Sequence, residues 1–236
     1  MKNLKTYFIT GTSRGIGFEL VRQLADGGHH IYATTQHPEN AVKLTELQQK
    51  HRDQIKILPL DIEKDASVTA LQQALESVGD ELVIDTVINN SGVYLDRADS
   101  FELVDLEHVR RTFEINTIGT MRVTRALMPF LNRSTAPKLI NISSLMGSIE
   151  DNTSGGYYGY RISKTAINMF TKSFAMDYPH ITALALHPGW VQTDMGGTSA
   201  PTSVEESVSG LIKVIDAAGL KRTGQFIDFE GDLLPW

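Results

Sequence analysis

Short runs of β-branched and aromatic residues alternate with segments of helical periodicity along the whole chain. In the helical segments apolar side chains recur three or four positions apart, as at Ile16, Leu20 and Leu24. The expected strands cover residues 6–10, 30–34, 55–60, 82–89, 138–143, 181–186 and 225–228. Such alternation predicts right-handed crossovers and a parallel sheet with helices on both faces. The expected fold is therefore an α/β, doubly wound sheet of about seven strands.

No internal repeat and no low-complexity linker divides the chain. Its 236 residues suit one large domain, so residues 1–236 are expected to fold as a unit. The most loop-like stretch is 196–202, and Ser203 follows it. Glu206 follows three positions later, which completes a capping box and predicts the start of another helix.

Charge and composition narrow the classes of partner. The net charge is -6 and no Lys/Arg cluster occurs, which argues against nucleic acid. The absence of cysteine excludes disulfides and thiolate zinc sites. The sequence also has no H-x-x-x-H pair of histidines, so we expect no other metal site. The apolar run at the start is too short for a signal peptide, and no stretch approaches the ~20 apolar residues of a membrane span. We therefore expect a cytoplasmic protein that contacts neither membrane nor nucleic acid.

A glycine-rich turn follows the first expected strand and runs directly into a helix. Gly11, Gly15 and Gly17 let backbone N–H groups approach a pyrophosphate, whose charge the helix N-terminus favours. The spacing is G-x-x-x-G-x-G, and a tight turn alone also requires glycine. The same stretch matches the hydrolase elbow G-x-S-x-G around Ser13, with His187 and Asp194 as nominal partners. That elbow belongs after a central strand with several strands before it, so a serine hydrolase is the weaker alternative.

A second group of polar residues lies in the latter half of the chain. Ser144 ends the fifth expected strand, at the edge where open α/β sheets bind ligands. Tyr160 and Lys164 are four positions apart and so share one face of a helix. Taken alone, the pair is better explained as an ordinary helix with a half-buried aromatic and a surface cation, because the Y-x-x-x-K spacing is common by chance.

Six motifs in order along the chain resemble the short-chain dehydrogenase/reductase family. They are the turn from Thr10 to Gly17, Asp61-Ile62, Asn89-Asn90-Ser91-Gly92 (with serine where the family has alanine), Asn116, the set Ser144, Tyr160 and Lys164, and Pro188-Gly189-Trp190-Val191-Gln192-Thr193. The resemblance implies a single Rossmann-type domain and catalysis by Asn116, Ser144, Tyr160 and Lys164. It also implies a nicotinamide cofactor held by Gly11, Ser13, Arg14, Gly15, Ile16, Gly17, Thr35, Asp61, Ile62, Asn89, Ser91, Gly92, Tyr160, Lys164, Pro188, Gly189, Val191 and Thr193.

The resemblance also implies roles and a reaction, namely hydride transfer between the cofactor and a small carbonyl or alcohol. Tyr160 would be the general acid or base, Ser144 would donate to the substrate oxygen, and Asn116 would hold a water. Lys164 would bind the ribose and lower the tyrosine pKa from ~10 to ~7, which needs roughly 4 kcal/mol. One ammonium about 4 Å away supplies that only in a partly dry site. By analogy with the family, a homo-oligomer is expected.

The stretch from Ser143 to Met169 resembles the C-factor and sniffer-like carbonyl reductase branch, because the spacing from serine to tyrosine is longer than usual. That branch includes proteins discussed as intercellular signals, so a dinucleotide-binding signalling protein with little turnover is the alternative function.

The cofactor is expected to be NADP(H) rather than NAD(H). The second strand ends at Thr35-Gln36-His37 without the carboxylate that binds an NAD ribose, and Arg14 is placed to pair with a 2′-phosphate. The segment 195–202 is expected to be a lid with few anchors, and Tyr94 and Trp190 are candidates for the pocket wall.

Overall fold

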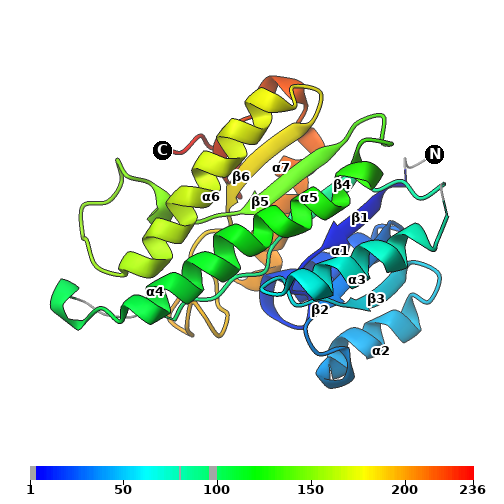
Figure 1. Cartoon of the computed structure of the whole chain (residues 1–236), viewed down its shortest axis with the longest axis horizontal. Coiled ribbons are helices and arrows are strands. Elements are labelled where there is room, and N and C mark those ends of the chain that lie inside the picture. The colour runs from blue at the N-terminus through cyan, green and yellow to red at the C-terminus, as the bar shows by residue number, and fades with distance from the viewer. Residues whose placement is uncertain (1–3, 80, 96–99) are drawn as a thin grey trace.

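Seven strands form one fully parallel sheet in the order β3-β2-β1-β4-β5-β6-β7 (Figure 1). The computed structural model describes residues 4–79, 81–95 and 100–236. The strands are β1 (Thr6–Ile9), β2 (His30–Thr35), β3 (Ile55–Pro59), β4 (Thr86–Asn89), β5 (Lys138–Ile142), β6 (Thr182–His187) and β7 (Gln225–Asp228). The doubly wound α/β fold predicted from the sequence is confirmed.

Helices connect the strands and cover both faces of the sheet (Figure 1). They are α1 (Gly15–Asp26), α2 (Val42–Lys50), α3 (Asp65–Glu76), α4 (Leu106–Phe113), α5 (Thr120–Leu131), α6 (Tyr158–Asp177) and α7 (Val204–Ala217). A π-helical turn, η3 (Glu114–Gly119), joins α4 to α5. Short 3-10 turns are η1 (Pro38–Asn40), η2 (Phe101–Leu103), η4 (Leu145–Gly147) and η5 (Leu220–Arg222).

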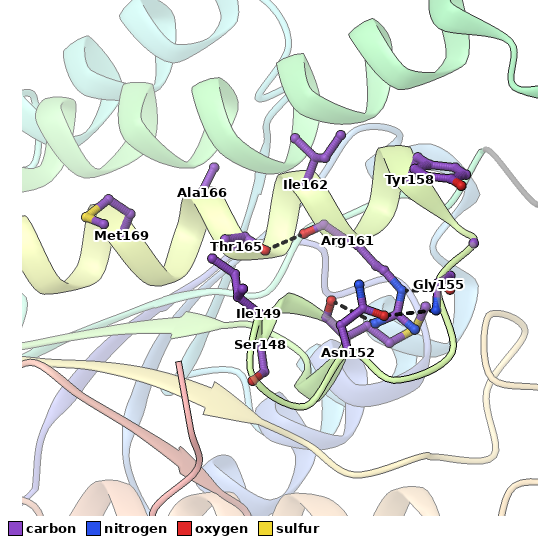
Figure 2. A pocket seen from close by; sticks show the side chains of 12 residues that line it. Ser148, Ile149, Asn152, Gly155, Tyr158, Arg161, Ile162, Thr165, Ala166 and Met169 are labelled. Carbon is purple, nitrogen blue, oxygen red and sulfur yellow. Dashed lines mark hydrogen bonds between the residues drawn. The ribbon is translucent and has the colours of Figure 1, made fainter. Parts of the chain in front are cut away.

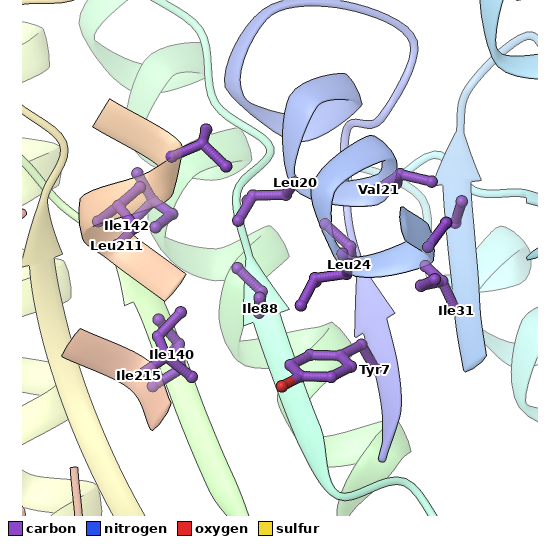
Figure 3. Packing of buried hydrophobic residues seen from close by; sticks show 14 of the residues in the cluster. Tyr7, Leu20, Val21, Leu24, Ile31, Ile88, Ile140, Ile142, Leu211 and Ile215 are labelled. Carbon is purple, nitrogen blue, oxygen red and sulfur yellow. The ribbon is translucent and has the colours of Figure 1, made fainter. Parts of the chain in front are cut away.

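The strands send alternate side chains into two separate hydrophobic cores. In β1, Tyr7 and Ile9 enter the core beneath α1, α2 and α7, whereas Phe8 enters the core beneath α3, α5 and α6. Figure 3 shows the first of these cores, with Leu20 and Leu24 of α1 packed over Ile88 and Tyr7. Because both faces are covered, the strands read as nearly continuous apolar runs.

The fourth strand is shorter than the sequence predicts. We expected residues 82–89, but ladder pairing begins at Thr86. Leu82 and Ile84 are buried, yet they only lead into the strand. Asp85 still bonds to both neighbouring strands through its backbone, but the Ile84 N–H donates to the Phe130 carbonyl of α5 (3.3 Å), so the chain before Asp85 lies outside the ladder.

Other expectations concern the ends of elements. The helix predicted after Ser203 is α7, and the Ser203 hydroxyl accepts from the Glu206 N–H at 3.1 Å. Residues 1–3, on which the argument about a signal peptide partly rests, lie outside the described residues. In the part of the chain that the structure describes, no helix is long and apolar enough to cross a membrane.

The strand order reverses between β1 and β4, and this reversal sets the position of the site. The chain leaves β1 toward β2 on one side, and β4 continues toward β5 on the other. Loops therefore diverge at the carboxyl ends of these two strands and leave a crevice, the usual ligand site of open α/β sheets.

Candidate active site

The glycine turn after β1 is shaped to hold an anion against the start of α1. Gly11 and Gly15 have φ of +69° and +55°, which side chains rarely adopt. A Cβ on Gly17 would lie 2.1 Å from the Gly11 carbonyl oxygen, so only glycine fits there. The N-cap residue of α1, Arg14, makes no side-chain capping bond to the first N–H groups of the helix, and the first turn has no acidic residue. These features fit the pyrophosphate of a dinucleotide.

Asn90 joins the glycine turn to the end of β4. Its side-chain amide donates to the carbonyl oxygens of Thr10 and Gly11, at 3.0 Å each. In return, the Thr10 hydroxyl accepts from the backbone N–H groups of Asn90 (3.0 Å) and Ser91 (2.9 Å). Asn90 was absent from the predicted site, although it stands inside the Asn-Asn-Ser-Gly motif. The sequence feature that could have identified Asn90 is its position at the end of β4, the strand next to β1.

The other predicted motifs converge on the same crevice. A Cβ on Gly11 would lie 2.8 Å from the Ser91 hydroxyl, and one on Gly15 would lie 3.4 Å from the Thr193 methyl group. Thr193 therefore stands over the glycine turn. Further along, a Cβ on Gly92 would lie 3.3 Å from Asn116 Oδ1 and 3.7 Å from Lys164 Nζ. The Pro-Gly motif is braced from behind, since the Ser207 hydroxyl donates to the Pro188 carbonyl (2.6 Å).

Beyond the ends of β2 and β3 lies the expected adenine side of the cleft. Asp61 accepts from Gln36 Nε2 (3.0 Å) and pairs with Lys64 Nζ (3.2 Å). Burial opposes the charge, but these contacts prevail and lower the Asp61 pKa. Ile62 is buried against Gly119 of η3, and Thr35 is buried at the end of β2.

Ser144, Tyr160 and Lys164 meet at the carboxyl end of β5. Burial raises the pKa of Tyr160 to about 12, against a smaller opposing effect of a hydrogen bond from Ser144. Lys164 is 5% exposed, and burial lowers its pKa to about 8. Its ammonium donates to the Ile142 carbonyl (2.8 Å) and lies 5.6 Å from the centre of the Tyr160 ring. The chain's own residues therefore keep Tyr160 protonated, and the lowering implied by the resemblance stays a prediction for the cofactor-bound enzyme.

Asn116 lies in the π-helical turn between α4 and α5, next to Lys164. Its side chain accepts from the Val93 N–H (2.7 Å) and donates to the Val93 carbonyl (2.9 Å). It also donates to the Ser163 hydroxyl at 3.0 Å. Inserted π turns recur at functional sites, and this one ties the loop after β4 to α6. The predicted role of Asn116 in holding a water stays a prediction.

The turn η4 fixes Ser144 against α6, and the sequence did not reveal how. Ser144 caps η4 by accepting from the Met146 N–H (3.2 Å). Gly147 then approaches α6 so closely that a Cβ on it would lie 2.7 Å from the Lys164 carbonyl carbon. The Gly147 carbonyl accepts from Thr165 Oγ1 (2.9 Å) and Asn168 Nδ2 (3.2 Å). Ser144 and Lys164 are thus held in one rigid unit.

The far end of the chain braces the same loop. The Trp236 carbonyl oxygen accepts from the N–H groups of Ile149 (3.0 Å) and Glu150 (3.1 Å), and from the Ser148 hydroxyl (3.2 Å). The Trp236 ring stacks on Phe226 of β7, with ring centres 5.6 Å apart.

Tyr157, at the start of α6, has a strained backbone. Its φ of +52° makes it the one non-glycine residue with positive φ in the described chain. For a residue with a Cβ the left-handed region costs roughly 1–2 kcal/mol. Its ring lies 5.8 Å from that of Tyr94, which lies 4.9 Å from that of Tyr160. Tyr94 was a candidate for the pocket wall, whereas Tyr157 was missed because no sequence signal marks a left-handed tyrosine.

Two of the predicted cofactor-binding residues also make contacts within the protein that the sequence did not reveal. The Asn89 side chain is buried and donates to Thr124 Oγ1 (3.0 Å) and Asn141 Oδ1 (2.8 Å), so it joins β4 to α5 and β5 rather than facing the cleft. Arg14 forms an exposed ion pair with Asp194 (3.3 Å), which links the glycine turn to the loop after Thr193.

The structure does not bring Ser13, His187 and Asp194 together as the catalytic triad of a serine hydrolase. Asp194 pairs with Arg14 instead of orienting a histidine. Burial lowers the His187 pKa to about 4, which leaves it a weak base, and its Nδ1 has no hydrogen-bond partner among the described residues. Ser13 is exposed on the glycine turn.

The segment 195–202 is anchored, contrary to expectation. Trp190 Nε1 donates to the Gly196 carbonyl (2.8 Å), and Gln192 Nε2 donates to the Ala200 carbonyl (3.0 Å). A backbone bridge also pairs Val191 with Thr202. Small residues suggested a loose segment, but side chains from the preceding loop hold it.

A groove of about 460 Å³ lies on the outer face of α6 (Figure 2). The helix residues that line it recur three or four positions apart and do not include Tyr160, which helical spacing places on the opposite side of the helix. Tyr158, Ile162 and Met169 line it along the helix, and Met146 and Ile149 line it from the loop. The described residues contain no group of three side chains suited to hold a metal ion.

Comparison with known proteins shows extensive similarity. The family model for short chain dehydrogenase matches residues 5–204. The C-signal protein of Myxococcus xanthus is 40% identical over 158 residues, which cover 65% of this chain and 93% of that protein. The carbonyl reductase Sniffer of D. melanogaster has a TM-score of 0.92 at 34% identity and covers 99% of this chain and 100% of its own. A carbonyl reductase from chicken fatty liver, solved with NADPH bound, has a TM-score of 0.92 at 33% identity, with 99% of both chains covered.

Proposed function

The chain belongs to the short-chain dehydrogenase family and is an NAD(P)-dependent oxidoreductase, and we propose that it reduces a carbonyl substrate with NADPH, using Tyr160 as general acid. The observation that carries this proposal is the meeting of Ser144, Tyr160 and Lys164 beside a glycine turn shaped for a dinucleotide. The similar carbonyl reductases support the reaction class.

The residues divide the work of carbonyl reduction. The nicotinamide, when bound, supplies the hydride. Ser144 Oγ donates to the substrate oxygen and orients it, and the Tyr160 hydroxyl delivers the proton as charge develops there. Lys164 binds the ribose hydroxyls and, as a cation, stabilises the tyrosinate left behind. Asn116 holds the loop at Val93 beside them and, by the proposal, a water that returns the proton.

The protonation state of Tyr160 in the protein without cofactor suits its proposed role as an acid. Burial raises the pKa of Tyr160 to about 12, so the phenol carries its proton at neutral pH and has one to deliver to a carbonyl oxygen. Oxidation of an alcohol would instead need the tyrosinate, and therefore a stronger positive charge beside the ring. Such a charge would come from the oxidised nicotinamide and a protonated Lys164 together.

NADPH is proposed as the coenzyme because of Arg14 and the end of β2. Arg14 is exposed at the glycine turn, and Gln36, which follows β2, bonds to Asp61 rather than presenting a carboxylate to a ribose. The bound NADPH in the chicken carbonyl reductase structure agrees with this assignment.

The test is Tyr160→Phe, assayed by NADPH oxidation against a panel of aldehydes and ketones. Removal of one hydroxyl should lower kcat by ~10²–10⁴-fold and leave NADPH affinity within a few-fold. Tyr158→Phe is the matched control, because that ring lines the outer groove. Near-normal turnover by Tyr160→Phe would refute the mechanism.

A second candidate function is intercellular signalling, which the similarity to the C-signal protein favours. A signalling protein would bind the dinucleotide without needing Ser144 and Tyr160 in register. Turnover of any carbonyl at a rate that Tyr160→Phe abolishes supports the enzyme, and tight cofactor binding without turnover on the whole panel supports the signal.

We also propose that the chain forms a homo-oligomer through the outer face of α6. Ile162, Met169 and Met176 there are 49%, 66% and 70% exposed, an apolar stripe that a second copy would cover. Light scattering after size exclusion tests this, and a monomer at micromolar concentration would refute it.

A further inference from the structure

Three tyrosine rings lie side by side at the candidate active site. Tyr94 stands between the other two, with its ring centre 4.9 Å from Tyr160 and 5.8 Å from Tyr157. The interplanar angles of 47° and 63° are those of tilted and edge-to-face contacts. Tyr94 and Tyr157 are both only half-buried, so each keeps a surface for a ligand.

The position of Tyr157 is maintained against its backbone preference. Gly155 and Gly156, both with φ of +66°, lead the chain into the left-handed turn, and the Tyr157 carbonyl then accepts from the Arg161 N–H (3.0 Å) to open α6. Any role limited to starting the helix would be filled more comfortably by glycine or asparagine. A strained backbone at a site edge points to a function for the side chain it carries.

We propose that Tyr94 and Tyr157 form an aromatic wall that selects flat, conjugated carbonyl substrates over saturated ones of the same size. The inference rests on the proposed function. A carbonyl oxygen within reach of Tyr160 and Ser144 places its substituent beside the neighbour of Tyr160, which is Tyr94. A planar aryl group can stack on or meet the edge of these rings, whereas a puckered ring of equal carbon number cannot.

The neighbouring Tyr158 provides an internal contrast. Its ring contacts Phe101, at 5.4 Å between centres, and lines the groove on the outer face of α6. In Figure 2 it stands at the end of that groove. Two adjacent tyrosines thus serve opposite sides of the helix, and only Tyr157 belongs to the wall.

The experiment compares benzaldehyde with cyclohexanecarbaldehyde, which differ in planarity but hardly in size. Their intrinsic reactivities differ, so the measured quantity is the ratio of their kcat/KM values in each variant divided by the ratio in the wild type. An aromatic contact contributes ~2–10-fold. Tyr157→Leu and Tyr94→Leu should each lower the aryl preference by about that factor, and Tyr157→Phe should leave it within 2-fold.

Tyr158→Leu is the matched control and should leave the ratio unchanged. Tyr157→Gly removes the ring while relieving the left-handed backbone, so it should lose the preference without loss of thermal stability. The inference is overturned if Tyr157→Leu lowers kcat/KM equally for both aldehydes, or if Tyr158→Leu shifts the ratio as much.

Failure of the reductase proposal is distinguishable from failure of the wall. Wild-type protein that reduces neither aldehyde contradicts the activity, and the wall is then judged by saturation-transfer NMR with benzyl alcohol and cyclohexylmethanol on the NADP-loaded protein. Transfer to benzyl alcohol that Tyr157→Leu abolishes supports the wall. Equal transfer to both alcohols refutes it.

Discussion

Replacing Gly147 by alanine should uncouple Ser144 from Lys164. The added methyl group would lie 2.7 Å from the Lys164 carbonyl carbon, 2.8 Å from its Cβ and 2.9 Å from its oxygen. Carbon atoms pack comfortably at ~3.5 Å or more, so η4 must move away from α6 by about 0.8 Å. The obstacle is backbone, which cannot rotate away as a flexible side chain could.

The size of the effect follows from this displacement. Overpacking of this kind costs ~1–3 kcal/mol, and the lower chain entropy of unfolded alanine offsets up to ~1 kcal/mol of it. The net cost is then up to about 3 kcal/mol, which in a domain of this length corresponds to a fall in Tm of up to about 12 °C. A misplacement near 1 Å at a catalytic group costs ~10²-fold. We therefore expect kcat to fall by ~10–100-fold, with NADPH affinity within a few-fold of the wild type.

The assay is steady-state NADPH oxidation with a good aldehyde, alongside a thermal melt. Gly219→Ala is the matched control, because among the described residues no atom outside its own chain neighbours lies within 4 Å of a Cβ at that position. Wild-type kcat in Gly147→Ala would refute the idea that the close approach of η4 places Ser144. So would an equal loss of kcat in Gly219→Ala, because the effect would then not depend on the contact with Lys164.

Three further predictions test the charges of the site. Arg14→Ala should weaken NADPH binding ~10-fold or more and leave NADH binding nearly unchanged, as a lost charge-assisted contact requires; fluorescence titration showing equal losses would assign Arg14 to the turn alone. Burial lowers the Lys164 pKa to about 8, so binding of NADPH to the free protein should weaken as pH rises through 8, and the same titration on Lys164→Met should give a flat profile. Burial also lowers the His187 pKa from 6.5 to about 4, so the folded protein binds fewer protons than the unfolded chain between these values. The free energy of unfolding, measured with urea, should therefore fall by up to about 3 kcal/mol as the pH drops from 6.5 to 4. A fall of the same size in His187→Gln would refute this explanation. His37→Gln is the control, because His37 is exposed.

The sequence by itself determined the fold class and the order of the motifs. Alternating strand and helix patterns are local, and burial on both faces requires nearly continuous apolar strands, so the parallel sheet could be read directly. The glycines of the turn were equally legible, because positive φ and the 2.1 Å approach at Gly17 leave few other residues possible. Ser144, Tyr160 and Lys164 could be identified as candidate catalytic residues only together with the other motifs, in their order along the chain.

Only the tertiary structure decided how those residues are held and which neighbours surround them. The start of β4 depended on the bond from the Ile84 N–H to the Phe130 carbonyl of α5, which is distant in sequence. The inward turn of Asn89, the placing of Ser144 by Gly147, and the contact of Tyr157 with Tyr94 likewise join segments far apart along the chain. Local patterns record which face of an element is buried. They do not show which distant side chain packs against that face, because this depends on how the elements pack together. The same packing buries Tyr160 and Lys164, which raises the pKa of the tyrosine and lowers that of the lysine.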